Sequence, residues 1–243
     1  MKITVFAGTG DGRELSVYLA SLGADITVSV TTEYGAELLK NSGADVRCGK
    51  LDEDEMRGLI RYNDVVIDAT HPYAAEASRN IINACRAEKI EYIRAVRQEV
   101  RSKNAVYVNN VAEAVEYLSE TDGKIFVSTG SNELAAFESI GSRIIARVLD
   151  TEPVRCRCSG MSINEIIYKR PPFDLEENLK DMKGCSFLVT KDGGDTGGMP
   201  EKLKAAEMLS MQVIIISRPE SGRDGYTFDK IKDMFRSKLS PGN

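Results

Sequence analysis

Residues Ile3-Thr-Val-Phe-Ala-Gly8-Thr-Gly10-Asp-Gly12-Arg-Glu-Leu15 join a short apolar segment to a glycine-rich turn and then to the start of a helix. The pattern predicts a strand at Ile3–Ala7 and a helix at Asp11–Leu22. Glycines let the backbone approach a ligand closely, and the N-terminus of a helix offers free N–H groups to a phosphate. The turn is therefore a candidate nucleotide site, and the alternative is a tight βα turn that binds no ligand.

The spacing of the glycines does not specify which nucleotide binds. The turn reads GxGxG, whereas the standard dinucleotide fingerprint would place its third glycine at Arg13. The second predicted strand leads into Thr31-Thr32-Glu33, the position at which a dinucleotide-binding fold reads the ribose. Glu33 could accept hydrogen bonds from ribose hydroxyls, and no arginine stands in this tripeptide to hold a 2′-phosphate.

Strand and helix alternate along the chain, and the alternation restarts after a polar segment at 97–104 that has the composition of a linker. This pattern predicts an α/β fold with two Rossmann-like domains whose mainly parallel sheets face a central cleft. We expect a nucleotide-binding domain at 1–98 and a second domain at 99–243 that contributes the rim of a substrate site. Further strands are predicted at 25–30, 44–47, 65–68, 92–94, 106–108, 124–128, 143–148, 165–168, 187–190 and 213–216, and further helices at 33–41, 52–61, 74–88, 111–120, 132–138, 175–182, 201–209 and 228–238.

Composition narrows the class of protein. The 243 residues are 42% hydrophobic and 28% charged, which is ordinary for a globular protein, and no apolar run approaches the roughly 20 residues that span a bilayer. The five cysteines are odd in number and contain no CxxC pair, and Cys156-Arg-Cys158 is too short for a zinc site. We therefore expect a reduced, cytoplasmic protein without a signal peptide, a membrane segment or a metal. The net charge of −5 argues against nonspecific nucleic-acid binding.

The single histidine of the chain lies in Asp68-Ala-Thr-His71-Pro-Tyr73, directly after the apolar run Val65–Ile67. Ligands of open α/β sheets bind outside the carboxyl ends of the strands, so a histidine at this position is a candidate site residue. The alternative is a histidine that only helps to begin the next helix.

Further turns at predicted strand ends could bind an anionic ligand. Ser128-Thr-Gly130-Ser-Asn132 offers hydroxyls and amides, and Lys191-Asp-Gly-Gly-Asp-Thr-Gly-Gly198 combines four glycines with a lysine. Residues 143–170 hold six arginines and lysines against three carboxylates, a local excess of +3 that could attract an anion. The alternative is a set of solvated arginines and ordinary βα loops.

In their order and spacing, these motifs resemble the precorrin-6A reductase family of the cobalamin (vitamin B12) pathway. The N-terminal turn is similar to the family's GT-x-(D/E)-(G/A)-R turn, Asp68–Ala74 to its DATHP-(F/Y)-A signature, and Ser128–Gly130 to its TG turn. The segment Lys191–Ala206 resembles its K-(D/E)-S-G-x-x-G-G-x-x-x-K-x-x-A-A loop and helix. Further matches are Arg147-Val-Leu149, Pro172-Phe173 and Arg218-Pro219. Gly193 replaces the family's loop serine, and a proline replaces the glycine before its PF pair.

The resemblance implies that NADH or NADPH reduces one C=C bond of precorrin-6A or of its cobalt form. The cofactor carries the hydride, so the protein must bind, orient and shield, and a large substrate with several carboxylates fits the basic residues. His71 and Tyr73 are candidates for proton delivery, with water as the alternative. Candidate cofactor-binding residues are Gly8, Thr9, Gly10, Asp11, Gly12, Arg13, Thr31, Thr32, Thr70, His71, Ser128, Thr129 and Gly130. Candidate substrate-binding residues are Arg147, Lys191, Asp192, Gly193, Gly194, Gly197, Gly198, Lys202 and Arg218.

Three questions stay open at this point. A noncatalytic nucleotide-sensing domain pair is the main alternative, although it would have no use for the lysine–glycine loop. A short-chain-type dehydrogenase is set aside because Tyr62, Tyr73 and Tyr117 lack a lysine four residues later. The missing arginine after Val30 favours NADH slightly, and with it the cobalt-containing substrate. The expected partner is the tetrapyrrole alone, and the sequence does not fix the oligomeric state.

Overall fold

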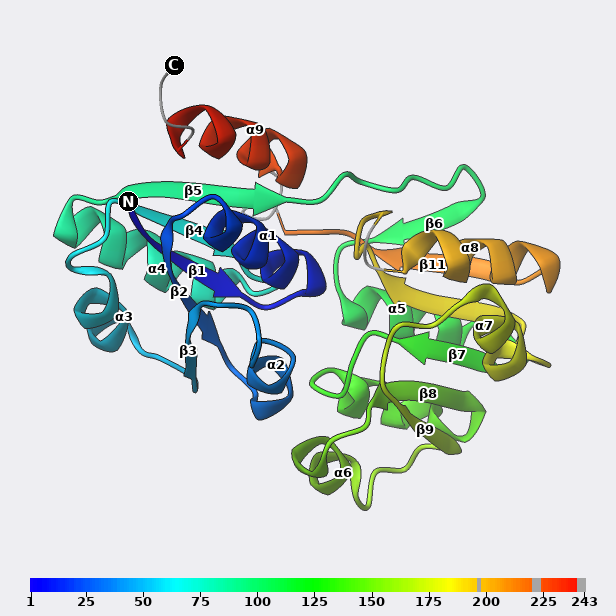
Figure 1. Ribbon diagram of the computed structural model, residues 1–243. Coiled ribbons are helices and arrows are strands. Elements are labelled where there is room, and N and C mark those ends of the chain that lie inside the picture. The colour runs from blue at the N-terminus through cyan, green and yellow to red at the C-terminus, as the bar shows by residue number, and fades with distance from the viewer. Residues whose placement is uncertain (196–197, 220–223, 240–243) are drawn as a thin grey trace. The chain divides into compact units, whose positions relative to one another are not determined.

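The computed structural model describes residues 1–195, 198–219 and 224–239, and it divides into two compact units (Figure 1). Unit 1 comprises Met1–Arg97 and Pro219–Asn243, and unit 2 comprises Gln98–Arg218. Each unit is an α/β structure built on a six-stranded parallel sheet, which confirms the predicted fold class. The central cleft stays a prediction.

Unit 1 has the strand order of a dinucleotide-binding Rossmann fold. Its sheet runs β12-β5-β4-β1-β2-β3, and all its strand pairs are parallel. The strands are β1 (Lys2–Ala7), β2 (Asp25–Val30), β3 (Asp45–Cys48), β4 (Val65–Ala69), β5 (Glu91–Val96) and β12 (Tyr226–Thr227). The helices are α1 (Gly10–Ser21), α2 (Glu33–Glu37), α3 (Glu53–Ile60), α4 (Ala75–Glu88) and α9 (Phe228–Leu239).

Alternate residues of the central strands build two cores in unit 1. Ile3 and Val5 of β1 pack in one cluster with α1 and α9, whereas Phe6 packs in another with α3 and α4. Successive side chains of a strand point to opposite faces, so helices cover both faces of this sheet (Figure 1). Each residue of β4 is buried, as expected for a strand inside such a sandwich.

The C-terminal segment belongs to unit 1, which corrects the predicted boundary of 99–243. Strand β12 pairs with β5, with Tyr226 opposite Ala95 and Thr227 opposite Val96. A Cβ at Gly225 would lie 2.5 Å from the carbonyl oxygen of Arg94, so only glycine allows this close approach. The paired residues are far apart in the chain, and local strand and helix patterns do not predict which distant strands pair.

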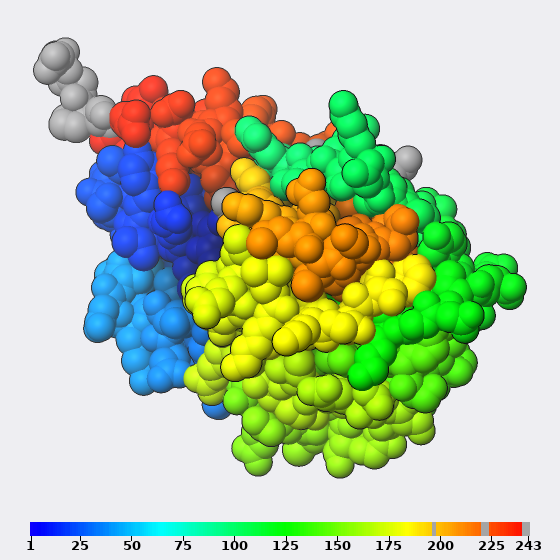
Figure 2. Space-filling model, turned by 90° about the vertical axis from the view of Figure 1, so that its right-hand side faces the viewer, coloured from blue at the N-terminus to red at the C-terminus, as the bar shows by residue number. Residues whose placement is uncertain are grey.

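Unit 2 contains a second parallel sheet in the order β6-β11-β10-β7-β8-β9. The strands are β6 (Ala105–Val108), β7 (Ile125–Ser128), β8 (Ile144–Leu149), β9 (Glu165–Lys169), β10 (Phe187–Lys191) and β11 (Gln212–Ile216). The helices are α5 (Val111–Ser119), the 3₁₀ segment η1 (Leu134–Arg143), α6 (Glu152–Cys158), α7 (Leu175–Met182) and α8 (Met199–Met208). Figure 2 shows α7 (yellow) and α8 (orange) side by side on one face of this unit. Met182 of α7 and Met199 of α8 are fully buried in the same hydrophobic cluster.

Three local predictions differ from the structure. The helix predicted at 132–138 is the 3₁₀ segment η1, and the helix predicted at 33–41 ends at Glu37. The segment after β8 contains Pro153, and no helix was predicted there. It forms helix α6, because proline is tolerated in the first turn, where its missing N–H has no intrahelical partner.

The order of strands reverses once in each sheet, and the reversal defines where ligands bind in open α/β folds. In unit 1 the reversal lies between β1 and β4, and in unit 2 it lies between β7 and β10. The predicted motif turns follow these four strands. Among the described residues, none of the helices is sufficiently long and apolar to pass through a membrane.

We predict that Phe235 anchors the C-terminal helix to unit 1. Phe235 is fully buried in the cluster that contains Ile3 and Leu15, so Phe235→Ala should lower the free energy of unfolding by about 3–5 kcal/mol. Urea denaturation followed by circular dichroism measures the change. The exposed residue Lys230 on the same helix supplies the control, and Lys230→Ala should change stability by less than about 0.5 kcal/mol. Equal stability of the two variants would contradict the assignment.

Candidate functional site

The glycine turn of unit 1 packs against the loop that carries the histidine. The Gly8 N–H donates to the Ala69 carbonyl over 3.4 Å, and a Cβ at Gly8 would lie 3.1 Å from the backbone nitrogen of His71. A Cβ at Gly12 would lie 3.0 Å from the Ala69 Cβ. The structure therefore brings the two predicted motifs together at the carboxyl ends of β1 and β4.

Gly10 differs from the other two glycines because the space around its Cβ position is open. A Cβ there would meet only the end of the Arg13 side chain, at 3.6 Å. Thr9 begins α1 as its N-cap, and its hydroxyl accepts from the Gly12 N–H over 3.3 Å. Asp11 forms an ion pair with Arg97, whose Nε lies 2.5 Å from its carboxylate. The turn thus combines a helix N-terminus, an open glycine and a nearby guanidinium, a set that suits a phosphate.

A buried carboxylate organises the histidine loop. The Asp68 side chain is fully buried, and its Oδ1 lies 2.5 Å from Nη1 of Arg94 on β5. The same oxygen accepts from the N–H and hydroxyl of Thr70, and Oδ2 accepts from the Tyr92 hydroxyl over 2.9 Å. Arg94 also donates to the Thr70 hydroxyl and carbonyl. Asp68, Tyr92 and Arg94 therefore fix the backbone at Thr70, and sequence reasoning had not selected Tyr92 or Arg94.

The surroundings of Asp68 shift the pKa values of two neighbours. Burial, followed by the charge of Asp68, raises the pKa of the Cys85 thiol to about 12. Burial, and then the charge and hydrogen bond of Asp68, raises the pKa of Tyr92 well above its usual range. Both groups stay protonated at neutral pH, so Tyr92 donates to Asp68 and Cys85 is not a reactive thiolate.

His71 and Tyr73 lie together at the end of this loop. The Nδ1 atom of His71 accepts from the Tyr73 N–H over 3.4 Å, and the two rings are 5.5 Å apart. In a neutral imidazole whose Nδ1 accepts, Nε2 carries the proton. The loop therefore presents two side chains that can hold a proton, both half-buried.

The predicted ribose position follows β2, next to β1 in the sheet. Thr31, Thr32 and Glu33 are exposed there, and the Thr32 hydroxyl accepts from the Gly35 N–H over 3.1 Å as the N-cap of α2. The three residues therefore stand at the same edge of the sheet as Gly8 and His71.

The strand reversal of unit 2 brings the other two predicted turns together. Ser128, at the end of β7, donates to the Val189 carbonyl over 3.4 Å, and Gly130 has a φ of +95° that favours glycine. Lys191, at the end of β10, places its Nζ 2.8 Å from Glu133 Oε1. Lys202 donates to the Thr190 hydroxyl over 3.0 Å. Thr129 and Lys191 therefore lie on the two strand ends that flank the reversal.

Arg218 binds the glycine loop, and its guanidinium is buried. Its side chain is buried, with Nε 2.9 Å from Asp192 Oδ2 and a further bond to the Asp192 carbonyl. Asp192 Oδ1 accepts in turn from the Gly194 N–H over 3.1 Å. The predicted direct contact of Arg218 with substrate is therefore not supported. Gly193 and Gly198 lie in the same loop, and Gly197 lies outside the described residues.

Arg147 is also buried, which does not favour a direct contact with substrate, and its role as a substrate clamp stays a prediction. Its guanidinium donates to Asp181 over 3.0 Å and to Asn178 over 2.7 Å, and it lies 3.9 Å from the centre of the Phe173 ring. Arg143, noted in the basic segment, lies at the amino end of β8, where it donates to the carbonyls of Gly123 and Leu118. Both arginines therefore hold the fold together.

The exposed cations of the basic segment are three arginines near the carboxyl edge of unit 2, namely Arg155, Arg157 and Arg170. Arg157 donates to Ser131 over 3.0 Å and to Asn132 over 2.5 Å, so it contacts the turn that follows β7. Arg155 and Arg170 both bond to Asp150. The charge excess of the sequence had indicated this segment, but not which of its arginines stay outside.

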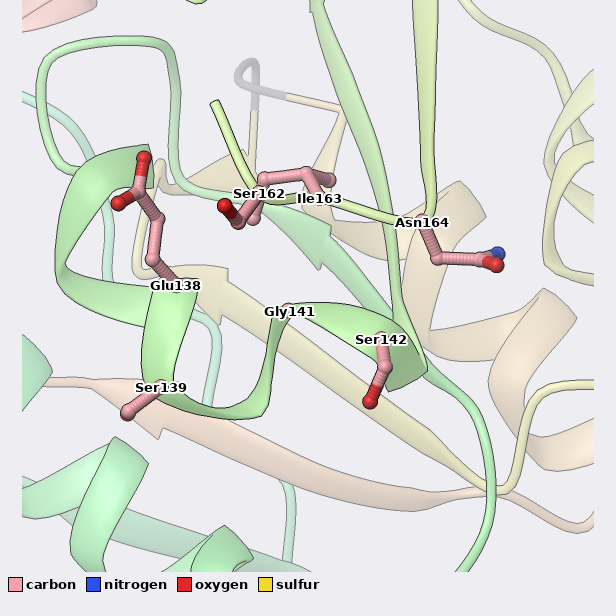
Figure 3. Close-up of a pocket in the computed structure, with 7 residues that line it drawn as sticks. All are labelled: Glu138, Ser139, Gly141, Ser142, Ser162, Ile163 and Asn164. Carbon is pink, nitrogen blue, oxygen red and sulfur yellow. The ribbon is translucent and has the colours of Figure 1, made fainter. Parts of the chain in front are cut away.

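A pocket of about 420 Å³ lies at the other edge of unit 2 and does not belong to this site (Figure 3). It is lined by Glu138, Ser139, Gly141, Ser142, Ser162, Ile163 and Asn164, which precede β8 and β9. No cation lines it, so it does not suit a ligand with several carboxylates. The described residues contain no group of acidic, histidine and cysteine side chains that could hold a metal.

Comparisons with known proteins identify relatives along nearly the whole chain. The family model described as precorrin-6x reductase CbiJ/CobK matches residues 2–237. A cobalt-precorrin-6A reductase of Methanothermobacter thermautotrophicus is 35% identical over 96% of this chain and 82% of the relative. A cobalt-precorrin-6A reductase of Priestia megaterium is 33% identical over 94% of this chain and 96% of the relative.

A solved structure supports the fold. The structure titled CobK precorrin-6A reductase aligns with a TM-score of 0.83 at 22% identity and covers 99% of this chain and 97% of that chain. At this identity the likeness establishes the arrangement of strands and helices. It agrees with the two Rossmann-like units described above.

We predict that Tyr92 stabilises the Asp68 network in a pH-dependent way. Tyr92→Phe removes a donor from the buried carboxylate and should lower the free energy of unfolding at pH 7 by about 1–3 kcal/mol. The folded state raises the pKa of Tyr92, so the contribution of its hydroxyl is complete below the ordinary tyrosine pKa of about 10 and falls as the pH rises above it. The gap between wild type and variant should therefore narrow above about pH 10.

Urea denaturation across this pH range measures the gap. Tyr62 is 80% exposed, so Tyr62→Phe supplies the control and should follow the wild type at each pH. A constant gap between wild type and Tyr92→Phe would show that the hydroxyl is not coupled to Asp68.

Proposed function

Because the chain belongs to the precorrin-6x reductase family, we propose that it reduces one C=C bond of cobalt-precorrin-6A or precorrin-6A with a nicotinamide nucleotide as the hydride donor. As a member of this family it is an oxidoreductase of cobalamin biosynthesis with a Rossmann-like fold. Both relatives above are named for the cobalt-containing substrate, which supports that form for this chain.

The observation that carries the proposal is the position of the motif turns. The glycine turn and the histidine loop flank the strand reversal of unit 1, and the TG turn and the lysine–glycine loop flank that of unit 2. In open α/β sheets this reversal is where ligands bind. Four turns that are separated along the chain thus meet in pairs at the two positions that the fold makes suitable.

Unit 1 fits a nicotinamide nucleotide. Gly8, Gly10 and the first turn of α1 would face the pyrophosphate, and Arg13 supplies a cation beside Gly10. Thr31 and Thr32 stand where the fold reads the ribose. The cofactor supplies the hydride when bound, and the protein supplies position and exclusion of water. Ser128, Thr129 and Gly130 remain proposed contacts from unit 2.

The protein must also provide a proton to the carbon beside the one that accepts hydride. His71 is the proposed donor because it stands in the loop that packs against the glycine turn, and an imidazolium there would release one proton and become the neutral imidazole. Tyr73 lies next to it and is the second candidate. Asp68 and Arg94 hold the start of this loop, so they would position the donor without touching the substrate.

Unit 2 supplies the proposed contacts for substrate carboxylates. Lys191 and Lys202 lie beside the strand reversal, and the amides of Gly193, Gly194 and Gly198 lie in the loop that Asp192 and Arg218 hold. Three exposed arginines, Arg155, Arg157 and Arg170, take the place of Arg147 and Arg218 in this proposal. A guanidinium can bind a carboxylate with two parallel hydrogen bonds, whereas lysine acts as a point charge.

An anaerobic assay tests the proposal directly. Purified enzyme is mixed with cobalt-precorrin-6A or precorrin-6A and with NADH or NADPH, and the fall in nicotinamide absorbance is followed. We expect reduction of the cobalt form, with NADH used at least as well as NADPH, because the tripeptide Thr31-Thr32-Glu33 contains no arginine. A clearly lower Michaelis constant for NADPH would reverse the cofactor assignment, and no oxidation with either substrate would refute the function.

We predict that a side chain at Gly10 blocks the cofactor. The folded protein has room for a Cβ there, so Gly10→Val should fold but weaken nucleotide binding by about 10- to 100-fold, because the backbone can no longer approach the pyrophosphate. Titration calorimetry with NADH or NADPH measures this without turnover. Gly58 of α3 has no atom within 4 Å of its Cβ position, so Gly58→Val is the matched control and should bind normally. Normal binding by Gly10→Val would place the cofactor elsewhere.

A further inference from the structure

We infer that Glu133 is the resident counter-ion of Lys191, and that a substrate carboxylate displaces it from Lys191 when the substrate binds. The inference rests on the proposed function, in which Lys191 binds a carboxylate of the tetrapyrrole. Glu133 would then set how tightly the substrate is held, although it touches no reacting atom.

The two residues face each other across the strand reversal of unit 2. Lys191 ends β10 and Glu133 follows the turn after β7, and these strands are neighbours in the sheet. Lys191 Nζ lies 2.8 Å from Glu133 Oε1. A carboxylate therefore already occupies the lysine at the place where an anionic ligand would have to bind.

The carboxylate of Glu133 is only half satisfied. In the part of the chain that the structure describes, its Oε2 is buried and has no hydrogen-bond partner, and the same holds for the Thr129 hydroxyl on the same turn. A charged oxygen that is removed from water and has no donor is destabilised. The ion pair is thus less stable than its 2.8 Å contact suggests, which favours exchange of Glu133 for another anion.

The other buried pairs of unit 2 differ in this respect. Arg218 binds Asp192 through Nε and Nη2, and Arg147 binds both Asp181 and Asn178. Each of those guanidinium groups has several fixed partners, so replacing one of them by an incoming carboxylate would cost free energy. Lysine is a point charge on a flexible stem, and the Glu133 side chain is 33% exposed, so it can turn into water when it is released.

If Glu133 had a purely structural role, its removal would have the opposite effect on substrate affinity, so the direction of the change distinguishes the two roles. If Glu133 only holds Lys191 in position, its removal weakens substrate binding. If Glu133 competes with the substrate, its removal strengthens binding. The isosteric change Glu133→Gln removes the charge and keeps the shape, so it separates the two roles.

Under the inference, Glu133→Gln should lower the substrate Michaelis constant by about 3- to 10-fold with kcat not reduced. Lys191→Ala should raise it by about 10- to 100-fold, and adding Glu133→Gln to Lys191→Ala should change nothing further, because no lysine is left to compete for. Glu138 is exposed on the 3₁₀ segment η1, which begins directly after Glu133, so Glu138→Gln changes the net charge equally and should behave as wild type. Lys183 is exposed and precedes β10, so Lys183→Ala is the control for Lys191→Ala and should behave as wild type.

A second measurement keeps the inference separate from the proposed function. An octacarboxylic porphyrin binds without turnover, and quenching of its fluorescence reports its affinity. Tighter binding by Glu133→Gln, absent in the Lys191→Ala background, supports the exchange even if the reduction assay fails. Weaker or unchanged binding of both porphyrin and substrate by Glu133→Gln overturns the inference, while normal reduction by the wild type leaves the proposed function intact.

Discussion

The ion pair between Asp68 and Arg94 is the interaction on which the arrangement of unit 1 depends. It joins the ends of β4 and β5, and its hydrogen bonds hold the N–H, hydroxyl and carbonyl of Thr70. The loop that begins there carries His71, and the glycine turn packs directly on its backbone. A pair of buried charges is stable only when its remaining donors and acceptors also form hydrogen bonds, and the Tyr92 hydroxyl donates one of these to Asp68. Removing a member would leave a buried charge at the centre of the site.

Unit 2 uses the same physical principle with different residues. Arg218, at the end of β11, holds Asp192, and Asp192 holds the backbone of the glycine loop through the Gly194 N–H. Arg147 holds helix α7 through Asp181 and Asn178. The buried arginines of unit 2 therefore bind fixed partners within the fold, whereas Arg155, Arg157 and Arg170 of the basic segment are exposed. This division explains how an acidic protein with many internal ion pairs can still offer positive charge at one edge.

The local patterns of the sequence predicted most of the fold and the strand ends at which the motif turns lie. Strands such as β4 contain short apolar runs, here Val65–Ile67, and the motif turns follow these runs closely, so periodicity and glycine spacing were sufficient to predict the strands. The return of β12 to β5 was not predictable, because strand pairing between distant segments leaves no local pattern. The burial of Arg147 and Arg218 was not predictable for a related reason. A sequence shows that an arginine is present near a strand end, but burial and partners such as Asp181 appear only after folding.

The departure from the dinucleotide fingerprint at Arg13 is explained by the different packing of Gly10 and Gly12. The third glycine of the standard pattern allows close packing of helix on strand, and here Gly12 does this, because a Cβ there would lie within 3.2 Å of both Ala7 and Ala69. With packing provided one residue earlier, the next position has no need of glycine and can carry a long side chain. That side chain returns to Gly10, the one member of the turn that neighbouring atoms leave open. The substitution therefore keeps the close approach of α1 to the sheet and adds a cation where a phosphate would lie.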